Sequence, residues 1–356
     1  MSAPVRTVPV PSSLATVAER VERRLGHLFA TELARWRNLS PDLGPPLEAL
    51  RALVMAGGKR LRPAFCYWGF VGVGGDPADP IVVDAGAAFE LLQAFALVHD
   101  DVMDGSATRR GAQTVHRDFA SRHDVEGWRG EARRFGEGVA ILAGDLAHVY
   151  ADMLIRNVGA AAIDVWDELR IELNVGQYLD ILGTARGDTD HAGARRIARY
   201  KSGKYTIERP LHLGAALAGR LGDVQVSLSA YGDPLGEAFQ LRDDILGAFG
   251  DSSLTGKPVG DDLREGKPTP LLAVATARAT PAHAALLRRV GDPDLTPDDI
   301  AALHAVLVDT GARAEIEASI ETLTLTAIEA IEIAPIDPEA RAALVELARY
   351  AAWREK

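Results

Sequence analysis

The sequence carries the periodicity of an α-helical protein along almost its whole length. Apolar residues, most of them Ala and Leu, recur at intervals of three and four positions, which places them on one face of a helix. No stretch alternates Val, Ile or Thr with polar residues in the way that indicates a β-strand. We therefore predict an all-α fold, with helices over residues 14–37, 62–72, 81–104, 138–157, 162–183, 191–218, 223–248, 266–290, 296–309, 311–331 and 337–354.

No boundary in the sequence separates two halves of different composition. The breaks are short, such as the Gly-Gly pairs at 57–58 and 74–75 and the turn residues of 292–297. We predict a single large multi-helix bundle over residues 14–356 behind a flexible arm of residues 1–13, although 356 residues would also suffice for two or three domains. The charged, glycine-rich segment 121–138 is predicted to be a surface loop, with a mobile flap beside the functional site as the alternative.

Composition excludes several classes of protein. An apolar content of 47% supports a sizeable core, and a net charge of −11 argues against a nucleic-acid-binding protein. The single cysteine, Cys66, rules out an internal disulfide framework and suits a reducing cytoplasm; its apolar neighbours favour a packing role. We find no targeting segment and no uncharged apolar run long enough to span a bilayer, so we expect a cytoplasmic protein without an integral membrane segment.

Three aspartates lie within one turn of a predicted helix that is otherwise apolar. They are Asp100, Asp101 and Asp104, and the helical repeat of about 3.6 residues places Asp100 and Asp104 on one face. Like charges at this spacing cost about a few tenths of a kcal/mol per pair unless cations neutralise them. Arg109 and Arg110 follow shortly after. Carboxylates that suit Mg²⁺, followed by guanidinium groups that suit phosphate, predict a site for a metal-bound diphosphate.

A second acidic pair, Asp243 and Asp244, lies far along the chain in another apolar helix. Gln240 precedes the pair by one turn, and Lys257 and Lys267 follow it. One aspartate pair is commonly only a solvated helix face, but two pairs, each followed by cations, favour a shared function. Two facing helices would be able to hold metal ions between them, as helical bundles do.

Two clusters of cations accompany this pattern. Lys59, Arg60 and Arg62 follow a Gly-Gly pair, and Lys201 and Lys204 flank a Ser-Gly pair. Either cluster alone would be interpreted as solvent-exposed charge. Glycine lets the backbone approach an anion closely, and Arg and Lys bind phosphate oxygens as a fork and as a point charge respectively. The clusters therefore favour a substrate with several phosphate oxygens.

Taken together, these motifs resemble the trans-type isoprenyl diphosphate synthase family. Four motifs occur in the family's order: Gly-Gly-Lys-Arg-Leu-Arg-Pro, Asp-Asp-Val-Met-Asp with Arg-Arg-Gly, Lys-Ser, and Phe-Gln-Leu-Arg-Asp-Asp with Gly-Lys. The resemblance spans about residues 45–275. It implies an all-α prenyl-synthase fold, usually a homodimer, in which the two Asp motifs face each other across a deep apolar cavity.

The resemblance also implies how metal ions bind. Asp100, Asp104 and Asp243 match direct Mg²⁺ ligands, in a cluster expected to contain three ions together with the substrate diphosphate. Asp101 and Asp244 match supporting positions. The family's second motif commonly has a third Asp where this chain has Gly247, so we expect retained activity with weaker support for that ion. Asp251 lies one further turn along, beyond Gly250.

Two diphosphates are implied as substrates. The allylic one, which is dimethylallyl, geranyl or farnesyl diphosphate, is expected to bind Arg109, Lys201 and Lys257, with Lys267 as a weaker candidate. The positions that match the neighbourhood of the reacting carbon are Ser202 and Gln240. The positions that match the site for isopentenyl diphosphate are Lys59, Arg62, Gln93 and Arg110.

The implied chemistry explains these residue types. Ionisation of the allylic C–O bond leaves diphosphate and a carbocation, which the alkene of isopentenyl diphosphate attacks before a proton is lost. Cations stabilise the departing diphosphate, and water must be excluded because it would quench the carbocation. No His or Glu in the motifs is clearly placed as the base, so we expect the departing diphosphate to take the proton. His99 is expected to be a packing residue or a residue that supports one of the site residues.

The helical turn before the first Asp motif predicts the product length. In the family, aromatic residues at the positions of Phe95 and Ala96 shorten the pocket; here only Phe95 is bulky. This pattern resembles a geranylgeranyl diphosphate synthase. Leu92 and Phe89, one and two turns deeper, would then close the bottom of the product pocket. The alternative is that Phe95 is an ordinary residue of the hydrophobic core. The alternatives are a farnesyl or farnesylgeranyl diphosphate synthase, a terpene cyclase, or a noncatalytic subunit of a heteromeric synthase.

Overall fold

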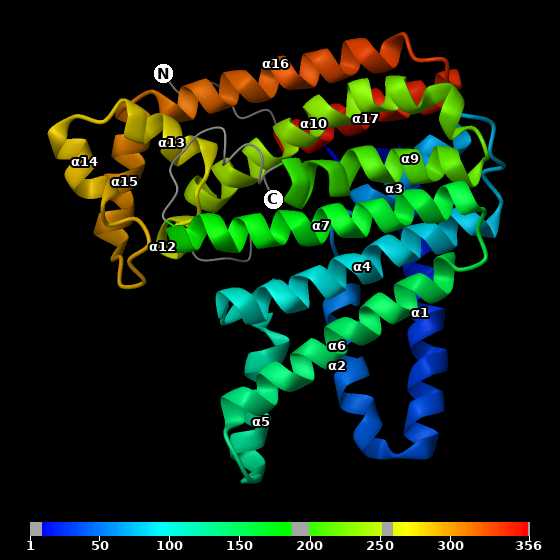
Figure 1. The fold of residues 1–356 in the computed structure, drawn as a ribbon, viewed down its shortest axis with the longest axis horizontal. Helices are drawn as coiled ribbons and strands as arrows, with labels where there is room; N and C mark the ends of the chain where they lie inside the picture. Colours follow the sequence, from blue (N-terminus) through cyan, green and yellow to red (C-terminus); the bar gives the residue numbers. More distant parts are fainter. Residues whose placement is uncertain (1–8, 187–198, 251–258, 355–356) are drawn as a thin grey trace. The chain divides into compact units, whose positions relative to one another are not determined.

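Helices make up almost all of the structure, a computed structural model that describes residues 9–186, 199–250 and 259–354, except for the side chains of residues 200–202 (Figure 1). Within these residues, the β-structure is a hairpin of β1 (Thr108–Arg109) and β2 (Ala112–Gln113). The predicted all-α fold is therefore confirmed.

The chain divides into two compact units, each of which is described by itself. The N-terminal unit comprises Ser12–Tyr67 and Asp76–Gly159; the C-terminal unit comprises Met1–Pro11, Trp68–Gly75 and Ala160–Lys356. The single domain expected from the sequence remains a prediction, as does the facing of the two acidic motifs.

In the N-terminal unit, α4 packs against α1 and α6, and α5 packs against α6. Figure 1 shows α4 and α6 running side by side. The described helices of this unit are α1 (Ser12–Leu39), the 3₁₀ turn η1 (Pro41–Leu43), α2 (Gly44–Met55), α3 (Leu61–Val71, which continues into the other unit), α4 (Pro80–Asp104), α5 (Val115–Glu126) and α6 (Ala132–Ile155).

Both ends of α4 follow from its sequence. At its start, the Asp79 carboxylate accepts the backbone N–H of Ile81 at 2.9 Å, and Pro80 occupies a position where no N–H is needed. At its end, Gly105 adopts the left-handed conformation with φ 66°. The acidic motif is therefore the last turn of a helix whose middle turns are buried.

Two glycines bring α6 close to its neighbours. A Cβ on Gly144 would lie 2.3 Å from Nε2 of His99 on α4, and a Cβ on Gly136 would lie 2.1 Å from the carbonyl oxygen of His116 on α5. His99 Nε2 also lies 3.0 Å from the carbonyl oxygen of Ile141. His99 thus packs against α6, as expected from the sequence.

In the C-terminal unit, α10 is the central helix and packs against η2, α16 and α17. The described helices of this unit are α7 (Ala160–Arg186), the π-helix η2 (Arg199–Glu208), α9 (Arg209–Leu217), α10 (Leu221–Phe249), α12 (Asp261–Glu265), α13 (Pro270–Ala277), α14 (Pro281–Leu287), α15 (Pro297–Asp309), α16 (Ala312–Glu332) and α17 (Pro338–Trp353).

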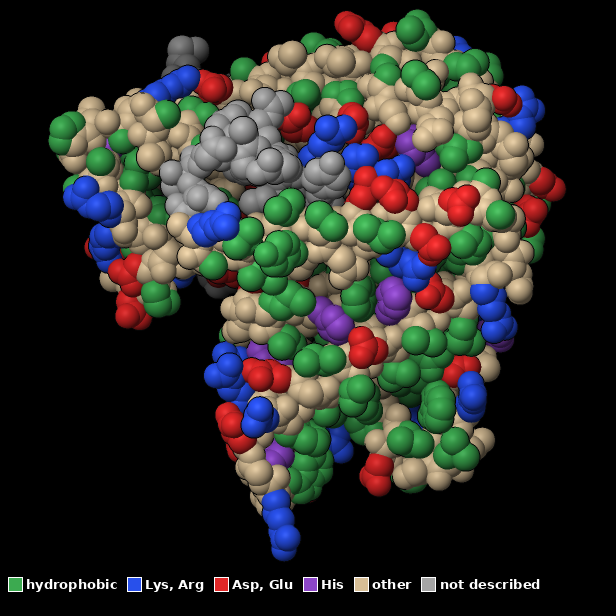
Figure 2. All heavy atoms as spheres, viewed as in Figure 1, with side chains coloured by type: hydrophobic (Ala, Val, Ile, Leu, Met, Phe, Trp, Pro, Cys, Tyr) green, Lys and Arg blue, Asp and Glu red, His purple; other side chains and the backbone are tan. Residues whose placement is uncertain are grey.

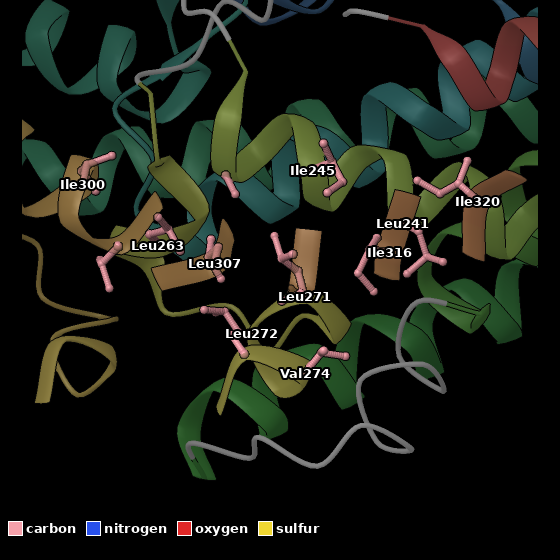
Figure 3. Packing of buried hydrophobic residues seen from close by; sticks show 14 of the residues in the cluster. Leu241, Ile245, Leu263, Leu271, Leu272, Val274, Ile300, Leu307, Ile316 and Ile320 are labelled. Atoms are coloured by element: carbon pink, nitrogen blue, oxygen red, sulfur yellow. The ribbon is translucent and has the colours of Figure 1, made fainter. Parts of the chain in front are cut away.

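One apolar cluster fixes the short helices of this unit against α10. Leu241 and Ile245 of α10 lie in the same cluster as Leu263 of α12, Leu271 of α13 and Ile320 of α16, all at most 4% exposed (Figure 3). Burying a side chain of this size contributes about 1.5–3 kcal/mol. Leu263 therefore ties the single-turn helix α12 to the second acidic motif.

Several predicted segments differ from the structure. The interpretation of 121–138 as a loop or flap is wrong, because α5 continues to Glu126 and α6 begins at Ala132. Gly127 ends α5 with φ 62°, and Gly136 and Gly138 lie inside α6; Gly127 thus caps a helix, and Gly136 allows close packing against α5. The patterns also missed α2 and α12, joined α13 and α14, and ended the arm two residues late. Cys66 is fully buried, as predicted.

Two described helices, α4 and α6, are long and apolar enough to cross a membrane by length and composition. Inside the structure, 61% of the apolar window of α4 and 39% of that of α6 are buried. Two such helices are weak evidence of membrane insertion, since core helices pass the same test. The absence of a membrane segment remains a prediction.

Candidate active site

The first acidic motif pairs with the arginine of the hairpin that follows it. Nε–H of Arg109 donates to Oδ1 of Asp101 at 2.7 Å, and Nη2 of Arg109 lies 3.4 Å from Oδ2 of Asp100. The side chain of Asp101 is 3% exposed, that of Asp100 is 16% exposed, and Asp104 is exposed. Asp101 is thus engaged by a cation, while Asp100 and Asp104 remain more accessible to solvent.

The hairpin turn separates the two adjacent arginines. Arg109 pairs with Ala112 across the hairpin, and the two residues between them have positive φ, 53° at Arg110 and 76° at Gly111. Two positive φ values are typical of a type I′ turn, which glycine favours. The turn directs Arg109 toward the α4 carboxylates and places Arg110 against the end of α2.

Arg110 lies beside the basic motif that contains Lys59 and Arg62, and we call Lys59, Arg62 and Arg110 the cationic cradle. The Nη1–H of Arg110 donates to the carbonyl oxygen of Leu53 at 3.0 Å and to that of Gly57. A Cβ on Gly58 would lie 3.3 Å from Nη2 of Arg110, so the glycine allows this approach. Burial, reinforced by the neighbouring charges of Arg60, Arg109 and Arg62, lowers the pKa of Arg110, although Glu90 opposes the shift. These cations favour an anion beside Arg110.

Arg60, in the middle of the basic motif, has a structural role. It is 3% exposed, pairs with Glu90 and lies 3.2 Å from Glu22, and its Nη2–H donates to the carbonyl oxygen of Val54. Lys59 and Arg62, on either side of it, are only partly buried. The motif therefore uses its central arginine inside the unit and leaves the flanking cations nearer the surface.

The second acidic motif combines an accessible and a buried carboxylate. The side chain of Asp243 is 39% exposed, whereas Asp244 is 6% exposed and its Oδ1 accepts Nε2–H of Gln240 at 2.8 Å. Burial, together with the charges of Asp262 and Asp243, raises the pKa of Asp244 to about 8, although the Gln240 hydrogen bond and Lys267 oppose the shift. Gln240 thus supports Asp244 directly.

Arg354, just after α17, pairs with Asp243. The arginine side chain is 1% exposed, donates Nη2–H to Asp243 and to the carbonyl oxygen of Phe239 at 3.2 Å, and lies 3.9 Å above the Phe239 ring. The sequence prediction missed this residue because more than one hundred positions separate it from the motif. Its buried charge lowers the local negative potential of α10.

A network of buried charges holds η2, the π-helix that contains Lys201 and Ser202. Arg209 donates two hydrogen bonds of 2.7 Å to the Glu172 carboxylate, and Lys204 lies 3.0 Å from Glu172 and 3.4 Å from Glu208. Ser229 donates to Glu208 at 2.6 Å. Figure 2 shows acidic and basic side chains interleaved in this part of the C-terminal unit. In the sequence, the i,i+4 spacing of Lys204 and Glu208 was the one pattern that indicated an ion pair in this network.

Four of the predicted residues have side chains outside the part of the chain that the structure describes. The side chains of Lys201 and Ser202, and all of Asp251 and Lys257, lie outside the described residues. Lys267 is described and lies 2.6 Å from Glu265. The sequence interpretation therefore remains untested at these positions.

The predicted chain-length residues lie on two faces of α4. The Phe95 ring packs on His99, with ring centroids 4.7 Å apart, and on His148 of α6, with centroids 5.0 Å apart. Ala96, one turn before Asp100, shares the face of that carboxylate. Leu92 is fully buried, and Gln93 is partly buried. Phe95 is thus turned toward α6, and Ala96 is the small residue below the acidic motif.

Among the described residues, no three His, Cys, Asp or Glu side chains are grouped closely enough to hold a metal ion by themselves. The acidic motifs would therefore need oxygen ligands from substrate or water to complete a coordination shell, as Mg²⁺ sites at phosphates usually do.

Comparison with known proteins identifies the family. A family model described as polyprenyl synthetase matches residues 46–307. The chain belongs to the polyprenyl synthetase family. It is 35% identical to a geranylfarnesyl diphosphate synthase of Aeropyrum pernix over 73% of this chain and 78% of the relative. It is 30% identical to an octaprenyl diphosphate synthase of Escherichia coli over 85% of this chain and 88% of the relative.

A solved structure agrees with the fold. The geranylgeranyl pyrophosphate synthase of Corynebacterium glutamicum, complexed with isoprenyl diphosphate and magnesium, superposes with a TM-score of 0.89. It shares 38% identity, over 95% of this chain and 99% of that protein. The predicted family, fold and prenyltransferase activity are therefore confirmed.

Proposed function

We propose that this prenyltransferase condenses isopentenyl diphosphate head-to-tail with an allylic diphosphate, in a Mg²⁺-dependent reaction that yields geranylgeranyl diphosphate. The observation that carries the proposal is the Arg-Arg-Gly turn, which gives two adjacent guanidinium groups different surroundings. Arg109 lies with the carboxylates of the first motif, and Arg110 lies in a cradle of other cations. This arrangement suits a reaction in which two diphosphates bind side by side, one at each arginine.

The residues present fit magnesium. Asp100 and Asp104 are hard oxygen ligands one turn apart, and Asp243 keeps an accessible carboxylate on α10. These three would hold the ions, which we propose number three with the substrate diphosphate. When bound, Mg²⁺ supplies Lewis-acid stabilisation of the leaving oxygens. Asp101 and Asp244, both buried, would orient their neighbours.

The chain's own cations would stabilise the departing diphosphate. Arg109 lies beside the first motif, and we propose that Lys201, Lys257 and Lys267 contribute point charges. Such preorganised groups stabilise the leaving group without solvent reorganisation. The diphosphate would then accept the proton lost from the new allylic product, because the described His99 is committed to packing against α6.

Isopentenyl diphosphate would occupy the cationic cradle. Arg110, Arg62 and Lys59 would bind its phosphate oxygens, with Gln93 as a neutral donor. Arg60 would act indirectly, by fixing the backbone of the motif through Glu90 and Val54. A guanidinium already oriented by two carbonyl oxygens loses less rotamer entropy on binding, which favours Arg110 as the principal contact.

Ala96 supports the proposed product length. It leaves space one turn below Asp100, while the Phe95 ring is engaged with His99 and His148. Overall identity carries little weight on this point, since relatives of similar identity are named for geranylfarnesyl and octaprenyl products. A farnesyl or farnesylgeranyl product is the alternative.

One incubation tests the proposal. The protein would be mixed with Mg²⁺, isopentenyl diphosphate and, in turn, dimethylallyl, geranyl or farnesyl diphosphate, and the products analysed by mass spectrometry. Geranylgeranyl diphosphate is the expected main product. A hydrocarbon product would indicate a terpene cyclase, and turnover only with a second protein would indicate a heteromeric subunit; either contradicts the proposal.

We also propose a homodimer in the cytoplasm, with α6 at the interface. Leu142, Val149 and Met153 of α6 are 63%, 53% and 36% exposed, an unusual apolar surface for one helix. Light scattering should give twice the chain mass of 38.0 kDa, and Val149→Glu should shift the protein toward the monomer. A monomeric wild-type protein would contradict the dimer.

A further inference from the structure

A carboxylate from another helix fills the space that the side chain of residue 247 would occupy. Gly247 lies on α10 one turn after Asp243 and Asp244. A Cβ built on Gly247 would lie 1.8 Å from Oδ2 and 2.4 Å from Cγ of Asp262. An acidic side chain at position 247 and the Asp262 carboxylate would therefore compete for the same volume.

The fold holds Asp262 in this place. Its neighbour Leu263 is 1% exposed and packs in the cluster that contains Ile245 of α10 (Figure 3). The backbone N–H of Gly291 donates to the carbonyl oxygen of Leu263 at 2.9 Å, and that of Lys267 donates to the carbonyl oxygen of Asp262 at 3.2 Å. The helix that carries Asp262 is thus fixed by both apolar packing and hydrogen bonds.

An independent observation concerns a buried oxygen of Asp244 that lacks a hydrogen-bond partner among the described residues. Asp244 is 6% exposed, and its Oδ2 has no hydrogen-bond partner among the described residues, whereas its Oδ1 is bonded to Gln240. Buried carboxylate oxygens are almost always hydrogen-bonded to protein or water. The charged groups that act on Asp244 include Asp262, Asp243 and Lys267, so this oxygen belongs to the same polar group.

We propose that Asp262 supplies, from α12, the third carboxylate that Gly247 does not supply from α10. In this arrangement, Asp243 binds the metal ion directly, and Asp262 accepts hydrogen bonds from the ion's water molecules. The inference rests on the proposed Mg²⁺ site at Asp243. It replaces the expectation that Gly247 weakens this side of the site.

The test measures metal binding apart from turnover. Binding of Mn²⁺ in the presence of inorganic diphosphate is measured by electron paramagnetic resonance for four proteins: wild type, Asp262→Asn, Asp261→Asn and the double variant Gly247→Asp with Asp262→Ala. Asp261→Asn is the matched control, because it removes the same charge from the adjacent position of α12. Thermal unfolding without metal checks that each variant folds.

Loss of an outer carboxylate typically weakens metal affinity about 10- to 100-fold, so we expect Asp262→Asn to weaken Mn²⁺ binding by about 10-fold. Asp261→Asn should leave binding unchanged, and the double variant, which moves the carboxylate to α10, should restore most of the lost affinity. Equal effects of Asp262→Asn and Asp261→Asn would overturn the inference, as would a folded double variant without restored affinity. Failure of the wild type to condense the two diphosphates would instead contradict the proposed function.

Discussion

The buried pair of Arg209 and Glu172 gives a quantitative prediction for the methionine substitution Arg209→Met. The two side chains are 14% and 9% exposed and share two hydrogen bonds of 2.7 Å. Removing one partner of a buried pair costs about 3–5 kcal/mol. Lys204 remains 3.0 Å from Glu172 and partly neutralises it, so the lower end applies. We expect a loss of about 3 kcal/mol and, for a chain of 356 residues, a fall in Tm of roughly 4 °C.

The test is a double-mutant cycle with Glu172→Met, in which urea unfolding gives the free energy of unfolding of each variant and calorimetry gives its Tm. The double variant should lie within about 1 kcal/mol of wild type, because well-packed apolar residues can replace a buried ion pair at little cost. Arg133→Met serves as a control, since Arg133 forms a bond of equal length, 2.7 Å, to Glu137 on the surface. Its Tm should not change.

The same variant tests the connection to catalysis. Arg209 follows η2 directly, and η2 carries Lys201, the proposed contact to the allylic diphosphate. Arg209→Met should raise the KM for the allylic diphosphate more than that for isopentenyl diphosphate.

A coupling energy between Arg209 and Glu172 below about 0.5 kcal/mol would refute the reasoning about the buried pair, because the effects of residues that do not interact add within that margin.

Four further outcomes are expected. Ala96→Phe should shorten the main product, as seen by mass spectrometry; an unchanged product spectrum would contradict the pocket argument. Arg110→Ala should raise the KM for isopentenyl diphosphate with little change for the allylic substrate in steady-state kinetics. Gly136→Ala should destabilise the protein by about 1–3 kcal/mol in urea, because its methyl group would meet the carbonyl oxygen of His116. Burial lowers the pKa of His212 from 6.5 to about 4, so the unfolded chain binds more protons between these values. Stability should therefore fall as the pH drops from about 6.5 toward 4, and less steeply in His212→Gln.

Local patterns predicted what depends on local sequence. Apolar periodicity located most long helices, and the Asp and Arg motifs stood out because their charges interrupt apolar stretches. The segment 121–138 shows where composition misleads. Glycine is flexible in isolation, yet Gly136 is required inside a helix because a neighbouring backbone passes within van der Waals distance.

Local patterns did not predict contacts between residues that are distant in the sequence. Asp243 contacts Arg354, and the place of a side chain at Gly247 is taken by Asp262. Neither pair lies at a spacing that a helical repeat brings onto one face, because the two residues of each pair belong to different elements of the fold. The missing third aspartate was visible in the sequence, but the substitute that we propose, Asp262, was visible only in the structure.

The position of the first acidic motif has a consequence for how the protein should be handled. The carboxylates lie at the end of α4, where the helix dipole is negative, and the last turn of this helix contains no basic residue. If the proposed ions bind there, they relieve a repulsion that the metal-free chain retains. Binding to the native state alone would add about 2.7 kcal/mol at an ion concentration of one hundred times Kd. Chelators would then lower the melting temperature, and shelf life would depend on the divalent cation in the storage buffer.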